Sequence, residues 1–315
     1  MIRGLKLIGL VVIGLLIILS IIPYLLPLQE LPGKEFEPLY DNSAVLAVEG
    51  VKLHYRQWAE EGSEGVLLVH GFSGSTFSWR YTAPALAEEG YRVIAVDLPG
   101  FGLSERNLNF SPTADHRAEL LWGLLESLDS GSDWHLVGHS MGGGVVAAMA
   151  LQRPDQVQSV TLAAGAIPAA GRRRSSWIFH YPPLGRAVRH LATRVFLSEE
   201  NVERALASAY GRAPTIDEFE GYYRPLLIKD SDAALVEMLK TRERDLLSDL
   251  AELQTPVLLI WGADDAWVRL EEGYKLNSLL KRAELVVLEG EGHCPMETAP
   301  LEFNSSLLRF LAEQR

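Results

Sequence analysis

Short apolar runs rich in β-branched residues alternate along this chain with longer segments whose apolar positions recur every three or four residues. The short runs have the length of buried strands, and the longer segments have the period of helices. Such alternation predicts a mainly parallel sheet with helices packed on its faces. The predicted strands are 66–69, 91–96, 134–137, 157–162, 257–261 and 284–288, and the predicted helices are 79–89, 115–128, 141–152, 270–280 and 300–313.

A hairpin is expected at the start of this sheet. Apolar runs at 44–48 and 51–58 flank Glu49 and Gly50, which have the spacing of a tight turn between antiparallel strands. With this pair added to the other predicted strands, the fold class is α/β, with a mainly parallel eight-stranded sheet flanked by helices.

The regular alternation stops between Leu162 and Thr255. Helical patterns rich in Arg, Tyr and Trp occupy this stretch instead. They indicate a helical cap inserted into the domain that holds the sheet. The expected division is a core of 43–165 and 250–315, a helical cap of 166–249, a linker of 29–42 and an N-terminal segment of 1–28.

Two groups of side chains in the expected cap have alternative interpretations. The basic run 172–174 fits a solvated loop, and contact with anionic headgroups is the alternative. The aromatic residues, taken one by one, fit the cap's own core better than the wall of an acyl pocket. They are Trp177, Phe179, Tyr181, Phe196, Tyr222 and Tyr223.

The N-terminal segment has no charged residue from Leu7 to Leu28 and consists mostly of Leu, Ile and Val. This length is enough to cross the roughly 30 Å hydrocarbon layer as a helix, so the sequence predicts a transmembrane anchor. Arg3 and Lys6 precede it, and mostly acidic residues follow it. By the positive-inside rule, the N-terminus lies in the cytoplasm and the catalytic domain outside it. A cleaved signal peptide is the alternative, but no small-x-small cleavage pattern follows the run.

Composition limits the function further. A formal net charge of −12 argues against a nucleic-acid partner, because phosphate contacts need clustered Lys and Arg. The single cysteine, Cys294, excludes an internal disulfide and a cysteine-built zinc site. The histidines show no metal-ligand spacing, so neither a metal nor a cofactor is expected.

A Gly-x-Ser-x-Gly sequence at 138–142 follows one predicted strand and precedes a predicted helix. This is the context of a nucleophile elbow, in which the turn pushes Ser140 out above the sheet. The amide of Met141, at the start of the helix, is placed to stabilise an oxyanion. A second donor is expected in the loop after strand 66–69, where we assign it to the amide of Phe72, while His70 has a structural role.

An acid and a base follow the last two predicted strands. Asp264 and Asp265 come after strand 257–261, and His293 lies in a glycine-rich loop after strand 284–288. The carboxyl ends of parallel strands share one edge of a sheet, so these loops should meet near Ser140. The chain order Ser, Asp, His is that of a hydrolase triad.

From about Val48 to its end, the chain resembles the α/β-hydrolase superfamily, in the branch with a His-Gly oxyanion loop. The resemblance implies Asp265 as the acid, because it lies three residues after the glycine that ends its strand. It also implies that Asp97, in the loop 97–104, shapes the edge of the sheet. Cys294 is then a small buried residue.

We expect a serine hydrolase that cleaves a small-molecule or lipid ester through an acyl-enzyme intermediate. A serine at the elbow argues against haloalkane dehalogenases and epoxide hydrolases, which resemble this scaffold but use a carboxylate. The main alternative is a carbon–carbon hydrolase of ring-cleavage products, suggested by the Pro-Gly-Phe-Gly sequence at 99–102. That group commonly has Asn where His139 stands. A non-catalytic binding module is a further alternative.

Overall fold

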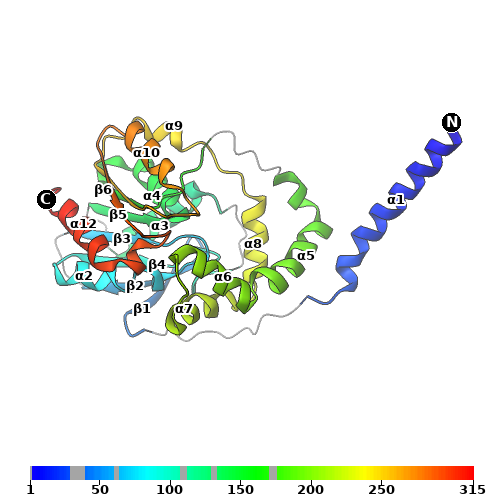
Figure 1. Ribbon diagram of the computed structural model, residues 1–315, viewed down its shortest axis with the longest axis horizontal. Coiled ribbons are helices and arrows are strands. Elements are labelled where there is room, and N and C mark those ends of the chain that lie inside the picture. Colours follow the sequence, from blue (N-terminus) through cyan, green and yellow to red (C-terminus); the bar gives the residue numbers. More distant parts are fainter. Residues whose placement is uncertain (1, 29–39, 60–63, 107–111, 129–132, 170–175) are drawn as a thin grey trace.

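The computed structural model of the chain describes residues 2–28, 40–59, 64–106, 112–128, 133–169 and 176–315. It contains an eight-stranded sheet covered by helices, with a further group of helices beside it (Figure 1). The basic run 172–174 and most of the predicted linker lie outside the described residues, so their interpretations stay predictions.

The sheet has the strand order β1-β2-β4-β3-β5-β6-β7-β8. Strand β2 pairs antiparallel with both β1 and β4, and all other pairs are parallel. The predicted sheet and its opening hairpin are therefore confirmed. The strands are β1 (Ser43–Val48), β2 (Val51–Trp58), β3 (Gly65–Val69), β4 (Arg92–Val96), β5 (Trp134–His139), β6 (Val157–Ala163), β7 (Val257–Gly262) and β8 (Ala283–Leu288).

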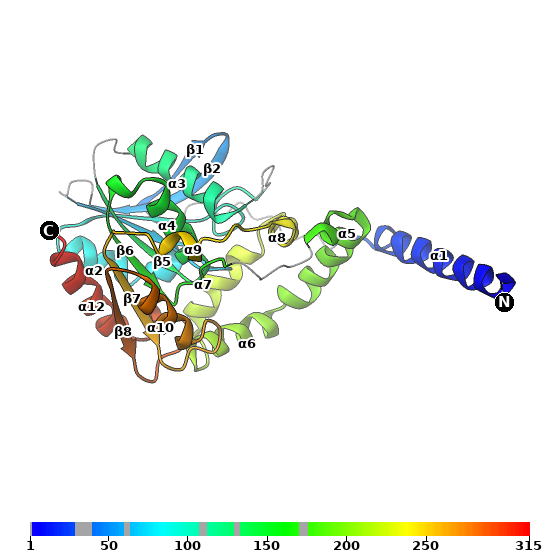
Figure 2. The ribbon, with the colours of Figure 1, turned by 90° about the horizontal axis from the view of Figure 1, so that it is seen from above.

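Alternate side chains of β3 point to opposite faces of the sheet, and each face has its own apolar core. Leu67 and Val69 pack in a cluster with α3 and α4, whereas Val66 and Leu68 pack with α2 and α12. All four strand residues are fully buried, which is why this strand is apolar without interruption. Figure 2 shows α3 and α12 on opposite sides of the sheet. The helices are η1 (Thr76–Trp79), α2 (Thr82–Glu88), α3 (Ala114–Leu128), α4 (Met141–Gln152), η2 (Pro154–Gln156), α10 (Leu270–Leu279), α11 (Pro295–Thr298) and α12 (Pro300–Ala312).

A second group of helices lies between β6 and β7 in the chain, where the sequence predicts helices (Figure 1). Its main members are α5 (Pro182–Leu191), α6 (Glu199–Tyr210), α7 (Ile216–Leu226) and α8 (Ser231–Lys240), which we call the cap helices. The shorter members are η3 (Ser176–His180), η4 (Ala192–Phe196) and α9 (Leu247–Leu250). The exact domain limits at 166 and 249 stay a prediction.

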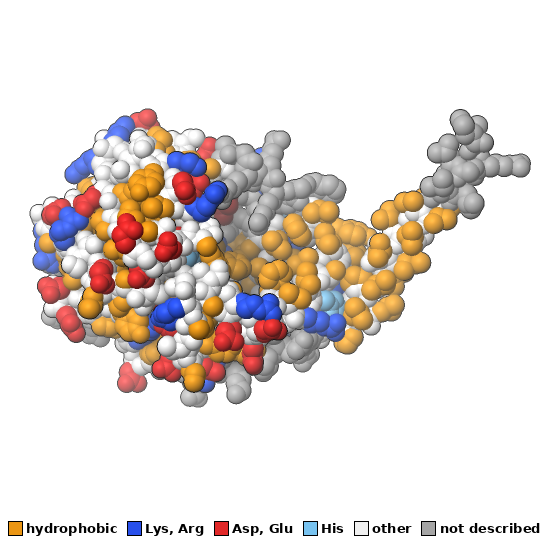
Figure 3. Space-filling model, in the orientation of Figure 1, with side chains coloured by type: hydrophobic (Ala, Val, Ile, Leu, Met, Phe, Trp, Pro, Cys, Tyr) orange, Lys and Arg blue, Asp and Glu red, His pale blue; other side chains and the backbone are white. Residues whose placement is uncertain are grey.

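Helix α1 (Ile2–Leu25) projects from the cap helices, away from the sheet (Figure 1). Its last turn contacts α5, where Nε of Arg186 donates a hydrogen bond to the carbonyl of Pro23 at 2.6 Å. Figure 3 shows apolar side chains along α1 and over the neighbouring part of the cap.

The prediction of a transmembrane anchor from Leu7 to Leu28, within the N-terminal segment 1–28, is wrong. Within the described residues, no helix is long and apolar enough to cross a membrane. A span needs about 20 consecutive apolar residues. Helix α1 ends at Leu25, short of the predicted limit at Leu28, and has Pro23 in its last turn. The predicted membrane partner depended on this anchor and is not supported. The predicted orientation, with the N-terminus in the cytoplasm and the catalytic domain outside it, is wrong for the same reason.

Candidate active site

Ser140 lies at the sharp turn between β5 and α4. Its φ of 49° and ψ of −118° are unusual for a residue with a side chain, and such strain is typical of functional turns. Backbone hydrogen bonds hold the turn: the Ser140 amide donates to Ala163 at 3.0 Å, and the Ser140 carbonyl accepts from Gly143 and Ala166 at 2.9 and 2.8 Å. The half-buried serine is thus fixed by β6 and α4 together.

Two glycines allow neighbouring backbone to approach the turn closely. A Cβ atom at Gly142 would lie 2.4 Å from the carbonyl oxygen of Val69, and one at Gly71 would lie 3.0 Å from Cβ of Ser140. The loop after β3 therefore packs directly against the serine. Phe72 follows Gly71 in this loop, and Met141 is the first residue of α4, so both predicted oxyanion donors flank the turn.

Asp265 and His293 form a buried pair. Nδ1 of His293 donates a hydrogen bond to Oδ2 of Asp265 at 2.8 Å. The other carboxylate oxygen, Oδ1, accepts from the amides of Trp267 and Val268 at 2.8 and 2.9 Å. Asp264, the competing aspartate of the sequence, is exposed. The structure thus brings His293 to Asp265 and leaves Asp264 outside.

His293 is held on several sides. Its backbone amide donates to the carbonyl of Ala209 at 2.7 Å. The Trp267 ring stacks on the imidazole, with centroids 5.4 Å apart. The ring of His139 lies 4.7 Å away, and its Nε2 donates to the His293 carbonyl at 2.9 Å. Since His139 directly precedes Ser140, these contacts bring the imidazole next to the nucleophile elbow.

The side chains of Ser140 and His293 are not hydrogen-bonded in this structure. Among the described residues, no hydrogen bond links Nε2 of His293 to the Ser140 hydroxyl, and Nε2 has no other hydrogen-bond partner there. Such bonds are often long in unliganded sites and tighten when a substrate binds. Because Nδ1 carries the proton toward Asp265, Nε2 presents a lone pair as a base.

His139 and His70 are neutral supports of the site. Burial, helped by the nearby His293, lowers the pKa of His139 well below its usual value. Burial also lowers the pKa of His70 to about 4. Nδ1 of His70 donates to the carbonyl of Gly71 at 2.7 Å, and Nε2 accepts from the Leu98 amide at 2.9 Å. His70 therefore ties the loop after β3 to the loop after β4, as a structural residue would.

Asp97 organises the loop after β4. Its carboxylate accepts from the amides of Thr76 and Leu103 at 2.6 and 2.7 Å, and from Nδ1 of His54 at 2.7 Å. Burial acts to raise the pKa of Asp97, but the interactions with His54, His70 and the Leu103 amide together outweigh it and lower the pKa. This carboxylate accepts three hydrogen bonds from the surrounding loops and strand, which suits the structural role expected of it.

Sequence reasoning missed the supports of His293. Trp267 and the Ala209 carbonyl lie in segments whose patterns carry no motif, and His139 was noted only as a difference from another group of hydrolases. The only available signal was proximity along the chain, since Trp267 follows Asp265 and His139 precedes Ser140.

A cavity of 600 Å³ lies between η1, the loop after β4 and α7. Its walls include Phe77, Arg80, Asp97 and Gly221, but neither Ser140 nor His293. We place the candidate active site at the serine and the histidine, because the polar geometry described above converges there. In the part of the chain that the structure describes, no cluster of His, Cys, Asp or Glu is arranged to hold a metal ion.

Comparison with known proteins agrees with this architecture. The sequence pattern of a family described as alpha/beta hydrolase fold matches residues 65–300. A protein of Bacillus subtilis (strain 168) called uncharacterized hydrolase YugF is 34% identical over 272 residues, which cover 84% of this chain and 96% of that protein.

Two other similar proteins have more specific names. A 2-hydroxy-6-oxononadienedioate/2-hydroxy-6-oxononatrienedioate hydrolase of Burkholderia vietnamiensis (strain G4 / LMG 22486) is 29% identical over 277 residues, covering 83% of this chain and 91% of that protein. A crystal structure of a membrane phospholipase A is 25% identical, with a TM-score of 0.70, and the match covers 100% of this chain and 99% of that one.

Proposed function

Because the chain belongs to the alpha/beta hydrolase fold family, we propose that it is a serine hydrolase that cleaves carboxylic esters through an acyl-enzyme intermediate. The observation that carries the proposal is the buried hydrogen bond of 2.8 Å between His293 and Asp265. It fixes the tautomer in which Nε2 is the base, in a histidine whose ring lies beside the residue preceding Ser140.

In this mechanism Ser140 is the nucleophile. Its hydroxyl attacks the carbonyl carbon of the ester while Nε2 of His293 takes the proton, and Asp265 stabilises the imidazolium that forms. The amides of Phe72 and Met141 donate hydrogen bonds to the oxyanion, where the start of α4 adds partial positive charge. His293 then returns the proton to the leaving alcohol. A water molecule, activated by the same histidine, releases the acid and restores the serine.

An ester substrate is supported by the likeness to the phospholipase A structure over the whole chain. The substrate class that we propose is a small-molecule or lipid ester. The strained φ of Ser140 suits this chemistry, because it presents the hydroxyl above the sheet at the start of α4.

Carbon–carbon hydrolysis is the second candidate. Several relatives that are 28% or 29% identical bear the name 2-hydroxy-6-oxononadienedioate/2-hydroxy-6-oxononatrienedioate hydrolase. The match to this chain covers 91% or more of the length of each. The loop of Pro99 to Gly102 also favours it. Against it stands His139, at a position where that group commonly has Asn.

The two candidates are separated by offering both substrate classes to the full-length protein. We expect turnover of p-nitrophenyl esters in a series from acetate to palmitate, with slower or no cleavage of a 2-hydroxy-6-oxo-dienoate ring-cleavage product. Ser140→Ala, folded as judged by circular dichroism, should lose several orders of magnitude in kcat. Ester cleavage at the wild-type rate by Ser140→Ala contradicts the serine mechanism, and preferential cleavage of the dienoate contradicts the ester.

A further inference from the structure

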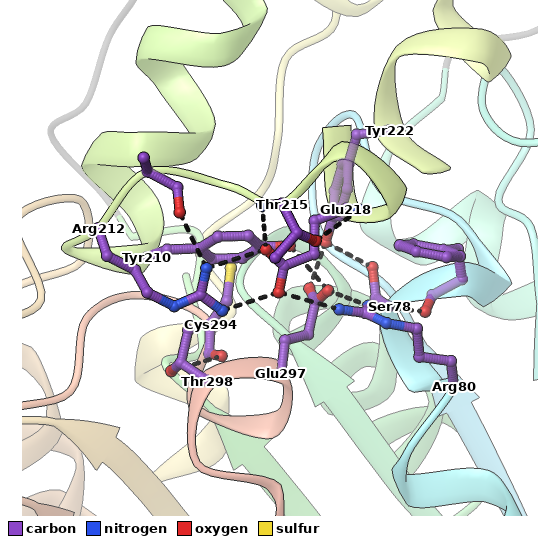
Figure 4. Close-up of polar contacts among 12 residues, drawn as sticks. Ser78, Arg80, Tyr210, Arg212, Thr215, Glu218, Tyr222, Cys294, Glu297 and Thr298 are labelled. Atoms are coloured by element: carbon purple, nitrogen blue, oxygen red, sulfur yellow. Dashed lines mark hydrogen bonds and ion pairs between the residues drawn. The ribbon is translucent and has the colours of Figure 1, made fainter. Parts of the chain in front are cut away.

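A buried carboxylate shortly after His293 in the chain accepts hydrogen bonds from both the core and the cap helices. Glu297, in α11, is 3% exposed. Its Oε2 accepts from the hydroxyl of Tyr210 at 2.9 Å and from Nη1 of Arg80, and its Oε1 accepts from the hydroxyl of Tyr222 (Figure 4). Ser78 donates to the Tyr222 oxygen at 2.8 Å, because the single proton of that tyrosine is used on Glu297.

The two tyrosines come from the cap, and their partners come from the core. Tyr210 ends α6 and Tyr222 lies in α7, whereas Arg80 and Ser78 belong to the η1 region and Glu297 to α11. Burial acts to raise the pKa of Glu297, and the guanidinium of Arg80 opposes this effect. The effect of burial prevails and the pKa of Glu297 is raised, so its three donors offset only part of its desolvation. The cluster nevertheless joins cap and core by buried hydrogen bonds that are costly to lose.

A second carboxylate extends the cluster. Glu218, also in α7, pairs with Arg212 through two hydrogen bonds of 2.9 and 2.8 Å, and lies 3.6 Å from Nη2 of Arg80. Arg80 therefore stands between a carboxylate of the cap and a carboxylate of the core (Figure 4). The turn between α6 and α7, which contains Arg212, is held on both sides.

The last turn of α6 touches both loops that carry the acid and the base. The Ala209 carbonyl accepts the His293 amide at 2.7 Å. A Cβ atom at Gly292 would lie 2.5 Å from that same carbonyl, so the end of α6 and the His293 loop are in close contact. Next to it, Ser208 accepts a hydrogen bond of 3.1 Å from Nε1 of Trp267, whose ring stacks on His293. Tyr210, the next residue, binds Glu297.

We propose that Tyr210, Tyr222 and Glu297 are positioning residues that hold the end of α6 against the His293 loop, an inference that rests on the proposed function of His293 as the base. The cluster fixes the last turn of α6, that turn fixes the backbone and the stacking partner of His293, and the imidazole is thereby held for Ser140. None of the three residues touches the reacting atoms. A displaced imidazole slows the proton transfer without removing any group that binds substrate.

The test compares single hydroxyl deletions in the full-length protein. Tyr210→Phe removes one donor from Glu297 and leaves the ring in place. The matched control is Tyr223→Phe, because Tyr223 lies in the same cap helix as Tyr222 and its hydroxyl makes no hydrogen bond among the described residues. Two rates are measured: turnover of a p-nitrophenyl ester, and labelling of Ser140 by a fluorophosphonate probe, at a temperature where circular dichroism shows every variant folded.

We expect Tyr210→Phe to lower kcat and the labelling rate together by about tenfold, with KM changed by less than about twofold. Tyr223→Phe should match the wild type in all three. A purely structural role of the cluster would lower the melting temperature and leave both rates unchanged in the folded protein, and that outcome overturns the inference. A rise in KM with unchanged kcat also overturns it, because it would assign the cluster to substrate binding.

Two further results keep the test decisive. If Tyr210→Phe does not fold, Tyr222→Phe removes the other tyrosine donor from the same carboxylate and is judged by the same criteria. Absence of serine labelling and of ester turnover in the wild type would overturn the proposed function itself. Labelling in the wild type with full rates in the variants overturns only the positioning role.

Discussion

At the scale of single residues, Asp265 illustrates how one side chain defines the state of another. It is buried, and in the described part of the chain its carboxylate accepts three hydrogen bonds, two from backbone amides and one from His293. A carboxylate in this position accepts only, so it selects the tautomer of His293 with the proton on Nδ1. Its neighbour Asp264 is exposed and exerts no such control.

Asp265→Asn should therefore lower kcat by roughly 10⁴-fold while the fold is kept, because an amide can donate to Nδ1 and favour the wrong tautomer. The measurement is ester turnover at pH 7 beside a urea unfolding curve. Asp264→Asn is the matched control and should retain wild-type turnover. Equal effects of the two substitutions would contradict the assignment of Asp265.

At the scale of elements, the N-terminus of α7 is closed by a capping box. The Thr215 side chain accepts from the Glu218 amide at 3.3 Å, and the Glu218 carboxylate accepts from the Thr215 amide at 2.7 Å. The hydrogen bonds of Arg212 and Thr215 lower the pKa of Glu218 to about 2. Helix α6 also begins after a hydroxyl residue, Ser198, but that side chain makes no capping bond and donates to Val195 instead.

Thr215→Ala should reduce the free energy of unfolding by about 1 kcal/mol, because the Glu218 amide loses the Thr215 hydroxyl as its acceptor and the capping box is broken. Ser198→Ala, the control at the start of α6, should change it by clearly less. Chemical denaturation of both variants with the wild type gives the comparison. If the two losses are equal, the capping box is not what stabilises α7.

At the scale of the whole molecule, the core contains histidines that are neutral when folded. Burial lowers the pKa of His70 and of His135 to about 4, and that of His139 well below its usual value. An unfolded histidine has a pKa of about 6.5, so between these values the unfolded chain binds protons that the folded chain does not. The stability that these histidines give is complete above about pH 6.5 and is lost as the pH falls toward 4.

We predict that the free energy of unfolding decreases from pH 7 to pH 4, and that His135→Phe reduces the slope of this decrease by about one proton. His135 lies on β5 and is remote from any proposed step. Urea unfolding at several pH values measures the slope. Ser278→Ala, an exposed change on α10 that removes no titratable group, should leave it as in the wild type. An unchanged slope for His135→Phe would show that His135 is not neutral in the fold.

The parts of this molecule that were predictable depend on local pattern. Strand β3 could be recognised because both of its faces are buried, and the pairing of His293 with Asp265 followed from loops at the ends of two neighbouring strands. The contact of Ala209 with His293 could not be predicted, because a helical pattern predicts a helix but not the segment against which that helix packs. The apolar start of the chain predicted a helix correctly, and failed only when its length was taken as a membrane span.

The chain leaves β6 at Ala163 and returns in β7 at Val257, and these two strands are direct neighbours in the sheet. Because these strands are parallel, the segment between them leaves β6 at the carboxyl edge of the sheet and must cross back to the amino edge before β7 begins. A different cap can be grafted there without changing the strand register if the returning segment keeps this crossover, so we expect new specificities to be accessible to engineering while the loops at the sheet edge are kept. The graft must also supply a main-chain acceptor where Ala209 meets His293.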